Sequence, residues 1–165
     1  MHPPAAAARW TARLAVAAFF VGVATTRVPQ RDAIASPVDV EITGAAYRWI
    51  VRYAGADGVL GTRDDRIGEG DLHVPRGLDV HVRLASRDYV YTVSLPAFGQ
   101  EQIAVPDMVF ELHLRAEEVG RSPLHGDEMC GLDHPDLERT VFVQEPRAWL
   151  RWLEALPTAA EIARP

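Results

Sequence analysis

Side chains that can bind a transition metal are concentrated in one short stretch, HGDEMCGLDHPDL, which runs from His125 to Leu137. It contains two histidines, one methionine and Cys130, the single cysteine of the chain. A thiolate and an imidazole together suit copper or zinc. Because only one thiolate is present, the stretch predicts either a metal site with few ligands or the remnant of a larger one.

The bulk composition narrows the classes of function. A length of 165 residues is enough for one modest domain that buries its own core. The net charge is −6 and all 17 basic residues are arginines, with no basic cluster along the chain. Nucleic-acid binding needs a concentrated positive surface, so this class of partner is excluded. A single cysteine also excludes an intrachain disulfide.

The elements that must position the candidate ligands are predicted to be strands. Apolar and polar residues alternate over residues 38–43 and 46–53, which is typical of half-buried strands. Further strands are expected at residues 78–84, 89–95, 108–115 and 140–144. Many short strands without interleaved helices predict an all-β sandwich or barrel. Near the end, PRAWLRWLEALP places Trp149, Trp152, Leu153 and Leu156 on one face of a short C-terminal helix that ends before Pro157.

The first residues predict export. Residues 14–26 are apolar and uncharged, with Arg9 and Arg13 before them and Arg27 after them. This pattern is typical of an export signal, and a short membrane anchor is the alternative. We therefore expect a signal or anchor segment at 1–27, a linker at 28–37, one domain at 38–157 and a tail at 158–165. Either kind of N-terminal segment exports the domain that follows it.

One acidic loop has a composition that could indicate a calcium-binding site. The stretch GADGVLGTRDDR, residues 55–66, is rich in glycine and aspartate. It lacks the ligand spacing and the closing glutamate of an EF-hand loop. A solvated hairpin is therefore expected, without a metal site.

Several stretches together resemble a known family. DLHVPRGLDVHVRLASRDYVYTVSLPAF, AVP, GDEMCGLDHPDL and VFVQEPRAWLRWL are similar to the extramembrane copper domain of cytochrome c oxidase subunit II, as is GAAYRWIVRYAGADGVLGTRDD. The resemblance covers roughly Val38 to Leu153. It implies a cupredoxin-like Greek-key β-barrel facing the periplasm, next to subunit I of a haem-copper oxidase. In this family a two-copper centre takes electrons from cytochrome c and passes them to haem, although quinol-oxidising relatives keep the fold without copper.

The resemblance also assigns residues to the copper site. Cys130 and His134 match the second cysteine and the loop histidine of the family, and Glu128 matches the glutamate that lends its carbonyl oxygen. Tyr47 lies where the family usually has the tryptophan at which electrons enter, and Trp49, two residues on, is retained.

Three other ligand positions of the family are changed. Tyr91 stands in place of the first histidine, Gly126 in place of the first cysteine and Leu137 in place of the methionine. A second bridging thiolate is therefore missing, so a normal two-copper centre cannot form. Three states of the site stay open: one copper ion held by Cys130 and His134 with help from Tyr91, Glu128 or His125; an empty site; or zinc or another metal.

Two functions from different classes follow. The leading one is a divergent, non-autonomous subunit of a cytochrome c oxidase-type oxidoreductase, which either relays electrons through one copper ion or serves assembly without copper. The alternative is a free periplasmic copper-binding carrier with no oxidase partner. A purely structural or interaction domain is a third hypothesis. His81 and His113 alternate with the apolar residues of their strands and are expected to face solvent.

Overall fold

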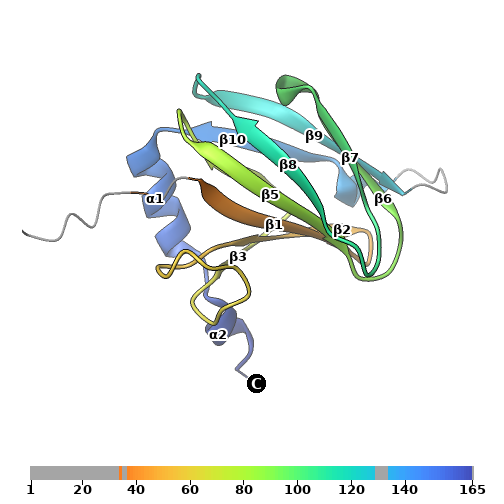
Figure 1. Cartoon of the computed structure of the whole chain (residues 1–165), viewed down its shortest axis with the longest axis horizontal. Coiled ribbons are helices and arrows are strands. Elements are labelled where there is room, and N and C mark those ends of the chain that lie inside the picture. The colour runs from red at the N-terminus through yellow and green to blue at the C-terminus, as the bar shows by residue number, and fades with distance from the viewer. Residues whose placement is uncertain (1–33, 35–36, 129–133, 165) are drawn as a thin grey trace, which may run out of the picture. The chain divides into compact units, whose positions relative to one another are not determined.

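The strands of the domain form two sheets that face each other. The computed structural model describes residues 34, 37–128 and 134–164, with residue 128 described by its backbone alone. In this part of the chain the first sheet has the order β3-β2-β1-β5-β8 and the second the order β4-β10-β9-β6-β7 (Figure 1). The bounds of the first sheet's strands are Val38–Ala45 (β1), Arg48–Tyr53 (β2), Arg66–Glu69 (β3), Asp79–Ser86 (β5) and Phe110–Arg115 (β8). Those of the second are Leu72–Pro75 (β4), Tyr91–Leu95 (β6), Gln100–Ala104 (β7), Gly120–Glu128 (β9) and Arg139–Gln144 (β10).

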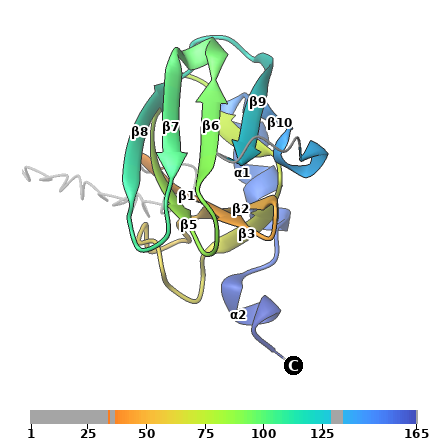
Figure 2. The same ribbon diagram turned by 90° about the vertical axis from the view of Figure 1, so that its right-hand side faces the viewer.

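The connections between the sheets give an all-β, cupredoxin-like Greek-key sandwich, which confirms the predicted fold. β1 pairs in parallel with β5, and β10 pairs in parallel with β4, while the other strand pairs are antiparallel. In Figure 2, β6, β7 and β9 of the second sheet lie in front of β1 and β2 of the first. The strands β3, β4, β7 and β9 are additions to those expected from the sequence.

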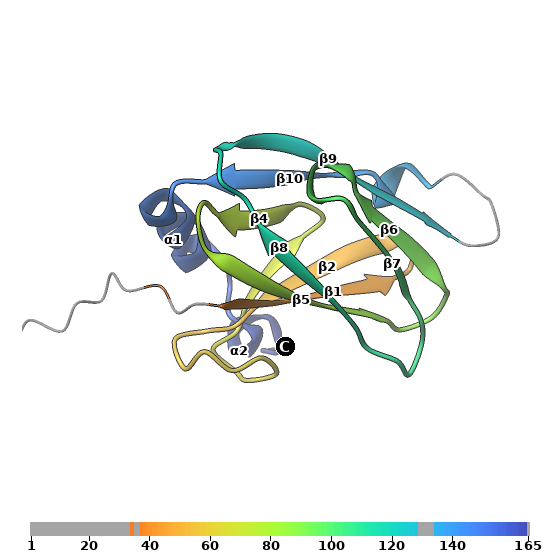
Figure 3. The same ribbon diagram turned by 45° about the horizontal axis from the view of Figure 1, so that its top comes forward.

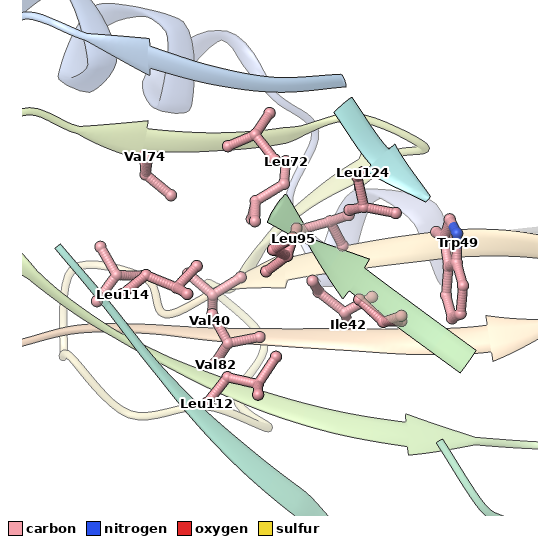
Figure 4. Packing of buried hydrophobic residues seen from close by; sticks show 14 of the residues in the cluster. Val40, Ile42, Trp49, Leu72, Val74, Val82, Leu95, Leu112, Leu114 and Leu124 are labelled. Atoms are coloured by element: carbon pink, nitrogen blue, oxygen red, sulfur yellow. The ribbon is translucent and has the colours of Figure 1, made fainter. Parts of the chain in front are cut away.

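The core lies between the two sheets. The alternation that predicted β1 and β2 is the burial pattern of the structure, since every second side chain of these strands points inward. Figure 4 shows Val40, Ile42 and Val82 of the first sheet meeting Leu95 and Leu124 of the second. Each of these five side chains is fully buried. Their removal from water is the main stabilising contribution to the fold.

Helix α1 (Pro146–Ala155) covers the end of the sandwich that lies away from the candidate metal site (Figure 1). The predicted helix is therefore confirmed, with Trp149 and Leu153 on its buried face. The indole nitrogen of Trp149 donates a hydrogen bond to the carbonyl oxygen of His73 in β4, at 3.0 Å. The ring of Trp152 stacks on the imidazole of His73 with 3.8 Å between ring centroids. These contacts fix α1 to the second sheet.

The C-terminal residues contain a second short helix. Helix α2 (Ala159–Ile162) lies within residues 158–165, which were expected to form a tail, and it begins with a capping box between Thr158 and Glu161. The backbone nitrogen of Ala159 donates to the carbonyl oxygen of Asp65 at 2.8 Å, and that of Ala160 donates to the carbonyl oxygen of Arg63 at 3.0 Å. The sequence TAAE has the residue pattern of a capping box, but this pattern was not used to predict a helix.

Neither the signal or anchor segment nor most of the linker can be described. The segment 1–27 and all of 28–37 except residues 34 and 37 lie outside the described residues, so these predictions stay predictions. Among the helices of the described part of the chain, none has the length and apolar character needed to span a membrane.

The acidic loop between β2 and β3 is held by an internal ion pair. It is a hairpin connection, as expected, because β2 and β3 pair antiparallel. Asp65 is fully buried, and its Oδ2 accepts hydrogen bonds from the backbone nitrogens of Gly61 and Thr62 at 2.7 and 3.1 Å. The same oxygen lies 3.0 Å from a guanidinium nitrogen of Arg52. The loop is thus organised by carboxylates of the protein itself, of which Asp65 is the buried one.

We predict that Asp65→Ala lowers the free energy of unfolding by about 3 kcal/mol, because it leaves a half-buried guanidinium and two amide donors without their acceptor. Urea denaturation of the full chain measures the change. The matched control is Asp57→Ala in the same loop, where an exposed carboxylate accepts one hydrogen bond from Val59. A cost at Asp65 no larger than that at Asp57 would contradict the importance of the ion pair.

Candidate metal centre

The candidate site lies where β6 and β9 pair at the end of the sandwich opposite α1. Their register places Tyr91 opposite Glu128 and Val93 opposite Gly126. This register brings Tyr91 and Gly126, which stand in the places of the first histidine and the first cysteine of the family, onto neighbouring strands two residues apart in the pairing. Cys130 lies outside the described residues, as does the side chain of Glu128, so their predicted role as ligands remains a prediction.

The space beside Gly126 is filled by the indole of Trp49. A Cβ atom placed on Gly126 would lie 2.7 Å from Cζ2 and 2.8 Å from Nε1 of Trp49, and 2.7 Å from the carbonyl oxygen of Leu137. Real Cβ atoms do not approach other heavy atoms so closely. The indole nitrogen donates a hydrogen bond to that same carbonyl oxygen at 2.9 Å. Glycine is thus required by the packing of Trp49 in this structure.

Leu137 and Trp49 belong to the core at this point. Leu137 ends the short 3-10 helix η2 (Pro135–Leu137), and its side chain is fully buried, as is that of Trp49. A leucine offers no lone pair to a metal, and here its side chain contributes apolar packing instead. The resemblance placed Trp49 near the point at which electrons enter, yet in this structure its ring is covered on all sides.

The hydroxyl of Tyr91 is held by two partners. It donates to Oδ1 of Asp88 at 2.7 Å and accepts from the backbone nitrogen of Tyr47 at 3.2 Å. Burial and the neighbouring Asp88 carboxylate both raise the pKa of Tyr91 well above its usual value. The phenolate, which is the form that binds copper, is therefore strongly disfavoured at neutral pH.

Asp88 organises the loops around this tyrosine. Its carboxylate accepts hydrogen bonds from the backbone nitrogens of Ala46 at 2.6 Å and Tyr89 at 2.8 Å, in addition to that from Tyr91. Burial alone would raise the pKa of Asp88, but these hydrogen bonds outweigh it and lower the pKa below its usual value. Asp88 was missed in the sequence, although it follows directly on β5 in SRD, a typical turn sequence.

Three aromatic rings stack beside the site. The ring of Tyr47 lies 3.9 Å from the imidazole of His134 and 4.9 Å from the ring of Tyr89, with interplanar angles of 20° and 19°. Tyr47 has a φ of 60° and Ala46 a φ of 49°, so both residues of the tight turn between β1 and β2 are left-handed. A bulky residue rarely adopts this conformation, and the stack on both faces of Tyr47 compensates its cost.

His125 points away from this cluster. Its side chain is half exposed, and its Nδ1 pairs with Oε2 of Glu138 at 2.8 Å. Because adjacent residues of a strand face opposite sides, His125 lies on the outer face of β9 while Gly126 faces Trp49.

The described residues do not fit a two-copper centre. Of the three changed positions, the space beside Gly126 is filled by an indole, Leu137 is an apolar core residue and Tyr91 is a hydrogen-bonded phenol. His134 is the one ligand of the family whose side chain belongs to the described part of the chain. Soft sulfur and imidazole ligands are what copper needs in such a site, and three of these are lost together.

Comparisons with known proteins agree with the fold and with the resemblance. The chain is 32% identical over 126 residues to cytochrome c oxidase subunit 2 of Thermostichus vulcanus, which covers 74% of this chain and 36% of the relative. It is 31% identical over 151 residues to the alternative cytochrome c oxidase subunit 2 of Bradyrhizobium diazoefficiens, covering 78% of this chain and 54% of the relative. This chain carries a cytochrome c oxidase subunit II-like domain.

Solved structures give the same assignment of the fold. The periplasmic domain of subunit II of cytochrome oxidase from Bradyrhizobium japonicum superposes with a TM-score of 0.63 at 20% identity, covering 74% of this chain and 95% of that domain. A mixed disulfide of a subunit II periplasmic domain with a thioredoxin-like protein gives a TM-score of 0.60 at 21% identity, covering 74% and 93%. No family model matches the chain. The subunit II-like chain spans between about a third and a half of the curated relatives it matches.

We predict that Gly126→Ala destabilises the subunit II-like domain by about 1 to 3 kcal/mol, because its methyl group overlaps the Trp49 indole and the Leu137 carbonyl. Gly120→Ala is the matched control, since it lies on the same strand and a Cβ there meets nothing within 4 Å. Urea denaturation compares the two variants. The cost at Gly126 should fall when Trp49 is also changed to Leu, and strict additivity of the two changes would contradict direct contact.

We predict that the contribution of Asp88 to the stability of the domain depends on pH. Because its pKa is lowered from the usual 3.8 in the folded state, its contribution to stability is present above that value and is lost as the pH falls through the lower, folded-state pKa. Asp88→Asn should therefore be less stable than the wild type above about pH 5, and the difference should shrink below about pH 4. Urea midpoints across this range measure it, with exposed Glu154→Gln as control. A difference that is constant with pH would contradict the role of the carboxylate charge.

Proposed function

We propose that the domain is a copper-free, subunit II-like component of a haem-copper oxidase, which serves assembly and docking on the periplasmic side of the membrane. The observation that carries this proposal is the Trp49 indole, which lies where a ligand side chain on Gly126 would extend. A domain built to hold two copper ions needs a cavity lined by sulfur and imidazole at this point. Here the same region is packed as protein core.

The neighbouring contacts support the same function. Tyr91 shares its hydroxyl with Asp88 and the backbone of Tyr47, and the ring of Tyr47 is stacked between Tyr89 and His134. These contacts rigidify the loops at the site end without requiring a metal. Tyr89 remains 43% exposed, so the aromatic cluster reaches the surface. Exposed aromatic rings on a rigid support are well suited to contact a partner protein.

The oxidase partner is proposed from similarity. The relatives are subunits of cytochrome c oxidases, and the matches cover 74% and 78% of this chain. The periplasmic location is proposed on the same basis, together with the export or anchor pattern of residues 1–27. A haem-copper subunit I is accordingly the proposed partner, and cytochrome c is not required as a donor to this domain.

Copper analysis of the full-length chain tests the metal part of this proposal. Anaerobic titration with Cu⁺, followed by oxidation, is expected to give no thiolate-to-copper absorption band and no retained copper after desalting. A subunit II that keeps both cysteines, both histidines and the methionine serves as positive control. If the chain retains one copper ion and Cys130→Ser abolishes it, the copper-free function is wrong and a mononuclear electron relay replaces it.

Purification from the native membrane tests the partner. Affinity-tagged chain is expected to co-purify with a haem-containing subunit, and Cys130→Ser should leave the yield of this complex unchanged. Deletion of residues 38–164 should lower the amount of assembled oxidase in the membrane. Recovery of the chain alone, with no haem and no other subunit, would contradict the proposal and favour a free periplasmic module.

A further inference from the structure

A second group of potential metal ligands lies on the outer face of the first sheet, away from the candidate centre. β1, β5 and β8 run side by side there (Figure 3), and their register places Asp39 opposite His81 and His81 opposite His113. Directly paired residues on neighbouring strands carry their Cβ atoms about 5 Å apart, so their side chains can act on one ligand. The two histidines face solvent, as predicted, but the prediction did not include their contact with each other.

The distance between the two imidazoles matches a tetrahedral metal ion. Nε2 of His81 lies 3.3 Å from Nε2 of His113. Two nitrogens bound to one tetrahedral zinc ion are also about 3.3 Å apart, because each Zn–N bond is about 2.0–2.1 Å long. The two Nε2 atoms, which in this structure are hydrogen-bonded to each other, thus lie at the separation that one ion requires, although they belong to different strands.

A carboxylate completes a three-ligand set. Glu111 precedes His113 by two residues on β8, so the two side chains share one face of the strand. A carboxylate oxygen of Glu111 and one ring nitrogen of each histidine lie within 4.8 Å of one another. Glu111 and His113 are exposed and His81 is half-buried. A small rotation of an exposed glutamate side chain is enough to bring its oxygen to bonding distance.

Asp39 lies close to the second ring nitrogen of the half-buried histidine. Its Oδ1 lies 3.6 Å from Nδ1 of His81, on the side of the ring opposite to His113. In many metal sites a carboxylate accepts the hydrogen bond from the second ring nitrogen of a ligand histidine, which fixes the tautomer that leaves the other nitrogen free for the metal. A small rotation of the partly exposed Asp39 side chain would bring its carboxylate within hydrogen-bond distance of Nδ1 of His81.

We propose that His81, His113 and Glu111 bind one Zn²⁺ ion on the outer face of the first sheet, with Asp39 as the positioning residue and a fourth coordination position open to water. Two imidazoles and one carboxylate are a set that zinc accepts, and an open position is typical of zinc sites that are not purely structural. The ion joins β5 to β8. The site belongs to a different sheet from β6 and β9, so it does not depend on whether Cys130 binds copper.

One neighbouring charge weakens the site and must be considered in its test. In the next row of the sheet, the register aligns Arg83 with Glu41 on one side and with Glu111 on the other. The guanidinium of Arg83 competes with a metal ion for the Glu111 carboxylate. Glu41 is the matched control for Glu111, because it is a carboxylate in the same row as Arg83 but outside the ligand set.

Zinc titration of the full-length chain tests the proposal, with Cys130→Ser as the background so that the thiol does not take up the ion. One Zn²⁺ per chain is expected by isothermal titration calorimetry, with a rise in the unfolding temperature, because an ion that binds only the folded state stabilises it. Co²⁺ should give the visible absorption of a tetrahedral site with nitrogen and oxygen ligands. The double substitution His81→Gln/His113→Gln should abolish all three signals while the chain stays folded by circular dichroism.

The remaining variants separate a built site from general surface charge. Asp39→Asn should weaken zinc binding by about tenfold or more, because it removes the partner of the His81 ring. Glu111→Gln should weaken it, whereas Glu41→Gln should leave it unchanged. Zinc binding that survives His81→Gln/His113→Gln, or that falls equally in Glu41→Gln and Glu111→Gln, would overturn the proposal.

Discussion

The hydrogen bond from the Trp49 indole to the Leu137 carbonyl oxygen ties the two sheets together at the site end of the sandwich. Trp49 belongs to β2 in the first sheet, whereas Leu137 lies between β9 and β10 of the second. The bond is buried, so water does not compete with it, and the carbonyl would be left unsatisfied without it. The absence of a side chain at Gly126 follows from it, since the indole takes that space. The apolar burial of Leu137 follows as well.

The fold could be predicted from the sequence largely because its core strands alternate. β1 and β2 bury every second residue, and β5 and β8 follow the same rule, so the period of two is visible without a structure. β3 and β4 have four residues each, which is too short for a period to be recognised. β9 was missed because Pro123 and Gly126 interrupt its pattern. The helix α2 depends on a local capping box rather than on an apolar face.

The candidate site could be predicted less completely. The loss of ligands at Tyr91, Gly126 and Leu137 can be predicted from the sequence, because it depends only on the type of residue at each position. The side chains that fill the space of the lost ligands cannot be predicted from the sequence. Trp49 is 88 residues from its partner Leu137, and only the folded chain brings them together. The same limit applies to His81 and His113, which are 32 residues apart and meet through the register of β5 and β8.

The tryptophans are placed so that the two ends of the sandwich can be observed separately. Figure 4 shows Trp49 at the end away from α1, and Trp149 and Trp152 belong to α1 itself. An indole that leaves a buried site changes its fluorescence, so Trp49 reports on the closure between β2 and the segment after β9. Trp149 and Trp152 report on the docking of α1 against β4. The chain has a fourth tryptophan, Trp10, outside the described residues. Variants that keep only Trp49 or only the two tryptophans of α1 would therefore distinguish opening at one end from opening at the other by intrinsic emission.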